Sequence, residues 1–363
     1  MAQPTRILPR SNRSREPYRT RTIKEVGERR LVAHIARIVG RMPASVSVGI
    51  GDDAAMVRIT SDRQLVASCD SVPEDLFAWK RGLISSFELG EYAVRVTLSD
   101  LASMGAHPIG LLWMIRVPSQ ARLSTFLEVA RGFVRAARRF GAPLVGGDTK
   151  ESRIFSIAAT ALGEIDPRRV ITRDGARPGD IVFCTGRLGL AAAALTYFSR
   201  WSLTSGPLPG SATKRLRDSL WSPAPLLATG TALSRLGLCT SCIDNTDGLG
   251  RSLSEISKSS SYRIEIDEAR LPLDPLAVTV AGLIGCDPID LTLSFGLDLN
   301  LIGTLRRPTR LRGLTIIGRV NRGRGVGPLA NRRRSAAYDK ANAFEHFRES
   351  FDARIARAWK GRA

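Results

Sequence analysis

The most constraining feature of this sequence is an alternation between short apolar runs and longer stretches with helical periodicity. Runs typical of buried strands occur at 109–117, 154–163 and 181–185. Stretches whose apolar residues recur every three or four positions occur at 88–104, 124–140, 226–236 and 250–259. The stretch 291–302 alternates apolar and polar residues as a strand does. Strands interspersed with helices in this way predict an α/β or α+β fold.

A boundary between two structural parts is expected near residues 164–180. Asp166-Pro167 favours a turn, and Arg177-Pro178-Gly179-Asp180 immediately precedes the expected strand at 181–185. A chain of 363 residues also favours two domains, because one domain takes roughly 150 residues. We therefore predict one domain over 23–165 and a second over 166–350, preceded by a basic, disordered arm over 1–22.

The positive charge of the chain is concentrated in two segments. The formal net charge is +20, with 54 Lys and Arg against 34 Asp and Glu. Residues 1–22 carry +5 and residues 306–334 carry +10, which leaves only +5 for all other residues. A nucleic-acid-binding protein is a natural alternative for so basic a chain. Because the body is almost balanced, we expect a solvated basic surface rather than a nucleic-acid partner.

Several classes of protein are disfavoured by what the sequence lacks. No run approaches the roughly 18 apolar residues that a membrane helix needs. The five cysteines are too scattered for a disulfide framework, and Cys239 with Cys242 forms a single pair that we interpret as core thiols. The chain has only three histidines and contains no P-loop, no strand-linked GxGxxG, no GxSxG and no HExxH motif. We expect a cytoplasmic protein without a membrane partner.

Five short acidic motifs stand where expected strands or helices meet loops. They are Gly49-Ile50-Gly51-Asp52-Asp53, Ser68-Cys69-Asp70, Leu98-Ser99-Asp100, Gly146-Gly147-Asp148-Thr149 and Asp244-Asn245-Thr246-Asp247-Gly248. Any one of them alone is typical of a turn or a helix cap. Together they favour a nucleotide site, since Mg²⁺ prefers oxygen ligands and shares them with phosphates. Adjacent glycines let backbone amides approach phosphate oxygens.

These motifs, with others in the same order, make the chain similar to the thiamine-monophosphate kinases of the aminoimidazole-ribotide-synthetase-like (PurM-like) superfamily. The likeness extends from about residue 50 to residue 347. Its further parts are Thr172-Arg173-Asp174-Gly175-Ala176, Pro178-Gly179-Asp180, Thr185-Gly186-Arg187-Leu188-Gly189 and His346-Phe347. Other branches of the superfamily fit less well, because no reactive cysteine precedes Gly51 and the chain does not end in cysteine.

The resemblance implies an ATP- and Mg²⁺-dependent phosphotransferase that makes ADP and thiamine diphosphate from ATP and thiamine monophosphate. It also implies a PurM-like fold of two domains. The N-terminal domain would form a β-barrel across the two-fold axis of a homodimer, with a C-terminal α/β domain behind it. Nucleotide and metal would occupy the cleft.

The resemblance also assigns expected roles to individual residues. The implied metal-binding positions are Asp53, Ser68, Cys69, Asp70, Asp100, Asp148, Asp244 and Asp247. The implied nucleotide-binding positions are Gly147, Asp148, Arg173 and Thr246. Asp148, Asp247 and Arg173 are the expected catalytic residues, because phosphoryl transfer depends on positioning and charge neutralisation.

The chain departs from the family at positions that concentrate in the acceptor half of the expected site. Family members carry threonine at Cys69, histidine at Phe77 and an aromatic residue near the C-terminus at Ala341. Leu297 stands where they carry a glutamate that binds the aminopyrimidine of the acceptor. A buried polar recognition group cannot become leucine without weakening that ligand. We therefore predict an active kinase with a changed acceptor. The alternatives are another PurM-like ATP-dependent enzyme and a non-catalytic protein that binds an acidic partner or nucleic acid.

Overall fold

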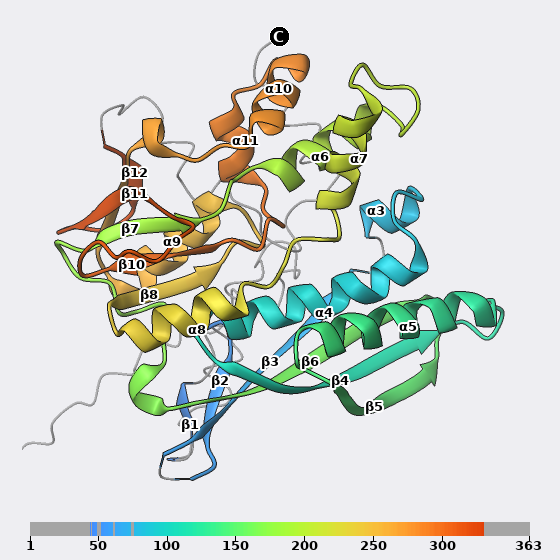
Figure 1. Ribbon diagram of the computed structural model, residues 1–363, viewed down its shortest axis with the longest axis horizontal. Coiled ribbons are helices and arrows are strands. Elements are labelled where there is room, and N and C mark those ends of the chain that lie inside the picture. Colours follow the sequence, from blue (N-terminus) through green and yellow to red (C-terminus); the bar gives the residue numbers. More distant parts are fainter. Residues whose placement is uncertain (1–43, 45, 49–51, 61, 74–75, 330–363) are drawn as a thin grey trace, which may run out of the picture.

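Two six-stranded sheets organise the chain (Figure 1). The computed structural model describes residues 44, 46–48, 52–60, 62–73 and 76–329. The first sheet has the strand order β1-β2-β3-β6-β4-β5, and the second has the order β12-β9-β11-β7-β10-β8. Each sheet comes from one continuous half of the described chain, so the predicted mixed α/β architecture in two parts is confirmed. The predicted arm at 1–22 lies outside the described residues.

The N-terminal part builds the first sheet and covers it with two long helices. Its elements are β1 (Val46–Val48), β2 (Ala55–Arg58), β3 (Gln64–Val72), α3 (Phe77–Lys80), α4 (Ser86–Ser103), β4 (His107–Val117), α5 (Leu123–Arg139), β5 (Leu144–Glu151) and β6 (Ser156–Ile165). Strand β6 pairs antiparallel with both β3 and β4, whereas β4 pairs parallel with β5. This order leaves β5 at the end of the described sheet.

The C-terminal part builds the second sheet after a short 3₁₀ turn, η1 (Pro167–Arg169). Its elements are β7 (Ile181–Thr185), α6 (Leu190–Arg200), α7 (Gly210–Ser219), α8 (Leu227–Leu236), β8 (Cys239–Asp244), α9 (Leu249–Ser260), β9 (Arg263–Ile266), η2 (Glu268–Arg270), α10 (Pro275–Ile284), α11 (Pro288–Ser294), β10 (Leu301–Leu305), β11 (Leu314–Asn321) and β12 (Val326–Pro328). Strand β7 has the bounds that the sequence predicts.

Helix α4 links the two parts. It begins with a capping box, in which the Ser85 hydroxyl accepts from the Glu88 amide and the Ser85 amide donates to Glu88. It packs tightly on α5, since a Cβ atom at Gly90 would lie only 2.1 Å from the Val129 carbonyl oxygen. Fourteen of its 18 residues are buried, and it contacts both β3 and β8. The helix therefore lies against strands of both sheets (Figure 1).

Two local predictions are wrong. The stretch 291–302 is not one strand: α11 extends to Ser294, and β10 starts only at Leu301. Asp287 caps α11 by accepting from the Ile289 amide, and Pro288 occupies the first helical position, so local capping overrides the alternating pattern. The second wrong prediction concerns Gly105-Ala106-His107-Pro108, a sequence typical of a helix end: His107 instead begins β4, which pairs with β6 at Glu164.

In the part of the chain that the structure describes, no single helix is long and apolar enough to span a membrane. The pair α10 and α11 meets the length and composition criteria only when the two are taken together. They are bent by 105° at the break between them.

Candidate active site

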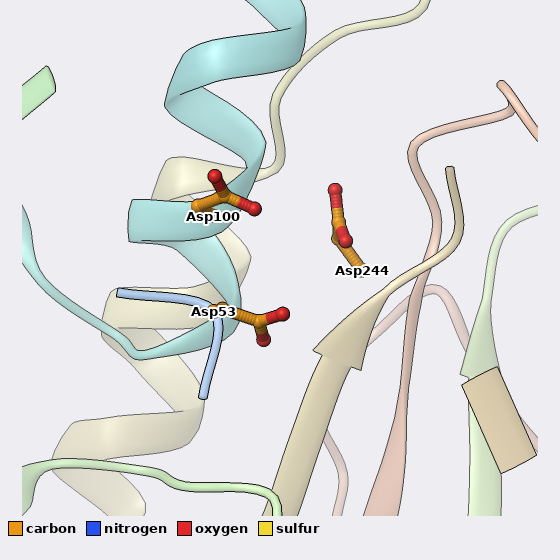
Figure 2. Close-up of side chains that lie close together, drawn as sticks. All are labelled: Asp53, Asp100 and Asp244. Atoms are coloured by element: carbon orange, nitrogen blue, oxygen red, sulfur yellow. The ribbon is translucent and has the colours of Figure 1, made fainter. Parts of the chain in front are cut away.

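Three carboxylates from distant parts of the chain converge between the two sheets (Figure 2). Asp53 lies in the segment before β2, Asp100 lies on α4, and Asp244 ends β8. One oxygen of each lies within 4.8 Å of the others. The Asp53 side chain is 1% exposed and Asp244 is 4% exposed. We call these three residues the carboxylate cluster.

Hydroxyl groups from the same helix and the neighbouring strand orient two of the carboxylates. Ser103 Oγ, on α4, donates to Asp53 Oδ2 at 2.6 Å. Ser68 Oγ, on β3, donates to Asp100 Oδ2. The sequence prediction included Ser68 but missed Ser103, although Ser103 lies one turn after Asp100 and so shares its helix face.

Burial and neighbouring carboxylates make the ionisation of Asp100 and Asp244 unfavourable. Burial, followed by the charge of Asp53, raises the pKa of Asp244 to about 8. Burial, followed by the charge of Asp244, raises the pKa of Asp100 well above its usual range. Like charges in a protein interior cannot all ionise without a cation to offset them. The cluster is therefore a place of unfavourable negative charge that a bound cation would relieve.

The donor set fits a hard divalent cation. Carboxylate oxygens are the ligands that Mg²⁺ prefers. Among the described residues, Asp244 Oδ2 is buried and has no hydrogen-bond partner, and the same holds for Nδ2 of the adjacent Asn245. A buried carboxylate oxygen without a partner is rare unless a ligand takes the place of the partner. Asp53, Asp100 and Asp244 are therefore the residues that would hold Mg²⁺.

The raised pKa values predict how pH affects stability. The carboxyl of Asp244 titrates near pH 8 in the folded chain, against 3.8 for an ordinary aspartate. Between these values the folded state binds more protons than the unfolded state, so raising the pH favours unfolding. With a chelator present, we expect the melting temperature to fall by about 3–6 °C between pH 6 and pH 8.5. Mg²⁺ binds the ionised form and should abolish most of this fall. Thermal unfolding at both pH values with chelator and with Mg²⁺ measures the effect, and identical falls under the two conditions would contradict it.

Arg173 provides a positive charge beside the cluster. Its Nε lies 3.0 Å from Asp53 Oδ1, its terminal nitrogen contacts the same oxygen, and its backbone amide donates to Asp52 Oδ2 at 3.2 Å. Burial lowers the pKa of the guanidinium, but the charge of Asp53 outweighs this and raises it above the usual value. Burial, followed by the charge of Asp53, also raises the pKa of Asp52 to about 6. Asp52 was not among the predicted site residues, although it stands directly before Asp53.

Asp70 and Asp247 lie near Tyr92, a buried residue of α4, and their charges affect its pKa. Burial, followed by the charges of Asp70 and Asp247, raises the pKa of Tyr92 above its usual value. Asp247 also raises the pKa of Asp244, and it lies 3.8 Å from Arg251 Nε. The sequence prediction missed Tyr92, which lies two helical turns before Asp100 on α4 and so faces the same way.

Cys69 is placed differently from its neighbours. Side chains alternate between the two faces of strand β3, so Ser68 and Asp70 share one face and Cys69 lies on the other. The Cys69 side chain is exposed, whereas Ser68 is 7% exposed. The substitution of cysteine for threonine therefore leaves the face that carries Ser68 and Asp70 unaltered.

The structure does not bring Asp148 into the cluster of the same chain. Asp148 lies on β5, in the sheet row formed by Met114 on β4, Ala158 on β6 and Ser71 on β3. Three strand spacings, about 14 Å, separate it from the Asp70 end of the site. Its side chain is half-exposed and pairs with Lys150 at 3.5 Å. Gly147 precedes it at φ 147°, against the backbone of β4.

The expected acceptor positions lie on separate elements. Phe77 begins α3, where the Arg81 guanidinium stacks on its ring at 5.4 Å. Leu297 follows α11 with φ 72°, and its amide donates to the Thr246 carbonyl oxygen at 3.0 Å. This hydrogen bond joins Leu297 to the turn after β8, in which Thr246 directly precedes Asp247. Ala341 lies outside the described residues.

Comparisons with known proteins find similar chains over most of the length of this one. Residues 51–165 match the model of the AIR synthase related protein, N-terminal domain. The chain is 32% identical to the thiamine-monophosphate kinase of Pyrococcus horikoshii over 76% of this chain and 84% of that protein. It is 30% identical to the enzyme of the same name from Mycobacterium tuberculosis, over 82% and 86% of the two chains. A solved structure described as AaThiL complexed with AMPPCP and TMP superposes with a TM-score of 0.78 at 26% identity, covering 90% of this chain and 99% of that one.

Proposed function

Because this chain belongs to the thiamine-monophosphate kinase family, we propose that it transfers the γ-phosphoryl group of ATP, bound with Mg²⁺, directly to a small phosphorylated acceptor. The observation that carries this proposal is the carboxylate cluster, with its buried and unpartnered Asp244 oxygen. In this site Mg²⁺ would supply charge neutralisation to the polyphosphate.

The residues of the chain would position the reacting groups. Asp53, Asp100 and Asp244 would hold the cation, and the nearby Asp70 and Asp247 would add negative charge to the same site. Arg173, already oriented by Asp53, takes the charge of the polyphosphate. As an oxygen of the acceptor phosphate bonds to the γ-phosphorus, the bond to the β,γ-bridging oxygen breaks and ADP leaves with the electron pair. The reaction needs the attacking oxygen, the γ-phosphorus and the leaving oxygen to be aligned, and it needs no covalent intermediate with the protein.

We further propose that the working enzyme is a homodimer in which Asp148 and Gly147 serve the partner's carboxylate cluster. Strand β5 ends the described sheet, and its residues from Val145 to Glu151 are exposed. An exposed edge strand offers unpaired backbone groups to another sheet. Val145 is 59% exposed and Ile109, on β4, is 44% exposed, which favours burial of this edge against a second copy. In such a dimer the Asp148 carboxylate of one chain would enter the site of the partner. Within one chain it lies about 14 Å from the Asp70 end of the site.

We propose that the acceptor is not thiamine monophosphate and that it differs from thiamine monophosphate in the chemical group that contacts residue 297. The family resemblance places a glutamate there, and Leu297 cannot accept a hydrogen bond. The partly buried Leu297 packs against the hydrophobic core instead. The favoured acceptor is therefore a phosphorylated molecule with an apolar group at this point.

Restoring the glutamate tests this assignment. We expect Leu297→Glu to raise kcat/KM for thiamine monophosphate at least about 10-fold, because one charged hydrogen bond to a substrate amine is worth more than 1.4 kcal/mol. Formation of thiamine diphosphate from ATP at saturating Mg²⁺ is the measurement. Leu297→Met is the matched control, because it keeps an apolar side chain of similar volume and should change little. Efficient thiamine diphosphate formation by the unaltered protein would refute the changed acceptor while leaving the kinase assignment intact.

A further inference from the structure

Asp298 caps a helix from a distant part of the chain. Its Oδ2 accepts from the Gly189 amide at 2.6 Å, and its Oδ1 accepts from the Ala191 amide at 2.9 Å. These amides belong to the start of α6, where the N-cap residue Gly189 has no side chain to offer. Burial raises the pKa of Asp298 to about 6, so the group is ionised at neutral pH and complements the helix dipole.

Two strained residues flank Asp298. Leu297 has φ 72° and Leu299 has φ 52°, both in the left-handed region that favours glycine. Residues held in such conformations persist only where surrounding contacts enforce them, and they concentrate at functional sites. Asp298 stands between these two leucines in the sequence, and its carboxylate is held by hydrogen bonds from two amides at the start of α6.

The loop 295–299, which contains the two strained residues, contacts the turn that carries Asp247. The Leu297 amide donates to the Thr246 carbonyl oxygen at 3.0 Å. A Cβ atom at Gly296 would lie 2.3 Å from that same oxygen and 2.5 Å from the Gly248 nitrogen. The two backbone segments therefore touch directly on both sides of Asp247, and a shift of the loop must shift the turn.

The other end of the loop is fixed to the second sheet. The Leu301 amide donates to Thr185 Oγ1 at 2.8 Å, and the Asn300 side chain donates to the Thr185 carbonyl oxygen. Between this anchor and the Thr246 turn, the Asp298 side chain joins the loop to the start of α6.

We propose that Asp298 is a positioning residue, which holds the loop 295–299 against the Thr246–Gly248 turn and so sets Asp247 relative to Asp244 for binding of Mg²⁺ and the ATP phosphates. The proposal rests on the proposed function, because it assigns Asp247 to the nucleotide site. Asp298 itself does not touch the reacting atoms.

Binding of a non-hydrolysable ATP analogue with Mg²⁺, measured by calorimetry, tests this without knowledge of the acceptor. In Asp298→Asn the amide cannot accept from both Gly189 and Ala191, so one contact is lost. We expect the dissociation constant to rise at least about 5-fold and the Mg²⁺ concentration for half-maximal binding to rise in parallel. Asp298→Ser, which keeps one short acceptor, provides a second variant if the asparagine variant does not fold, and the same weakening is expected.

Asp274→Asn is the matched control. Asp274 is also buried and also caps a helix, accepting from the Leu276 amide at the start of α10 while pairing with Arg215. It should lose thermal stability and bind the analogue as the unaltered protein does. Unchanged analogue binding in a folded Asp298 variant, or equal weakening in Asp274→Asn, would overturn the proposal. Failure of the unaltered protein to bind the analogue would instead refute the proposed function.

Discussion

Replacing Asp244 with asparagine is expected to lower ATP-dependent phosphoryl transfer by at least about 1000-fold, which corresponds to ~4 kcal/mol of transition-state stabilisation. The same change is expected to raise the melting temperature of the metal-free protein. Asparagine keeps the shape of the side chain and is always neutral, whereas the Asp244 carboxyl, whose pKa is raised to about 8, must hold in the folded state a proton that it loses on unfolding. Its amide can also donate to a neighbouring carboxylate of the cluster. Loss of activity with gain of stability is typical of a residue that is retained for function.

Asp180→Asn provides the contrast. Asp180 is 5% exposed and accepts from the Arg177 amide and from Thr240 Oγ1. This carboxylate serves the fold, so its asparagine variant should melt at a lower temperature and keep kcat within about 3-fold. Initial rates of ADP formation at saturating Mg²⁺, with melting curves in chelator, give both quantities. An Asp244→Asn variant that keeps a tenth of the activity, or that melts lower than the unaltered protein, would contradict the assignment.

Asp148→Asn alone is expected to lower activity at least about 100-fold, although Asp148 lies outside the cluster of its own chain. Co-expression of Asp148→Asn and Asp244→Asn chains should then restore about one quarter of the unaltered activity. In the proposed homodimer, half of the dimers would be hybrids, and each hybrid would have one site in which an intact cluster meets the Asp148 of the other chain. The measurement is specific activity of the purified mixture, corrected for the ratio of the two chains.

A chain carrying both substitutions, co-expressed with the unaltered chain, is the control for this complementation. If Asp148 acts on the partner's site, hybrids with the doubly substituted chain are inactive and about one quarter of the activity remains. If Asp148 acts within its own chain, about one half remains and the first mixture stays inactive. The two mixtures are therefore equally active if Asp148 acts on the partner's site, whereas only the control mixture is active if Asp148 acts within its own chain.

Local sequence patterns predicted much of the fold. Strand β7 has its predicted bounds because Pro178-Gly179 ends the preceding turn and Gly186 ends the strand. Helix α4 was predicted within two residues at its start and one at its end. The strand expected over 291–302 was wrong because the Asp287 cap and Pro288 start a helix that alternation alone does not reveal. Chain segments follow their local pattern unless a cap or a tertiary contact opposes it.

The sequence by itself determined the family and the identity of the acidic motifs, because glycine, serine and aspartate in a fixed order report backbone turns and oxygen ligands. It could not determine which motifs meet. Asp53, Asp100 and Asp244 converge because α4 packs against both sheets, and Asp148 stays apart because the strand order places β6 and β4 between β5 and β3. The raised pKa values and the unpartnered Asp244 oxygen also arise only from that packing. Residue types set what each group can bind, whereas distance and burial, which exist only in the folded chain, decide which groups act together.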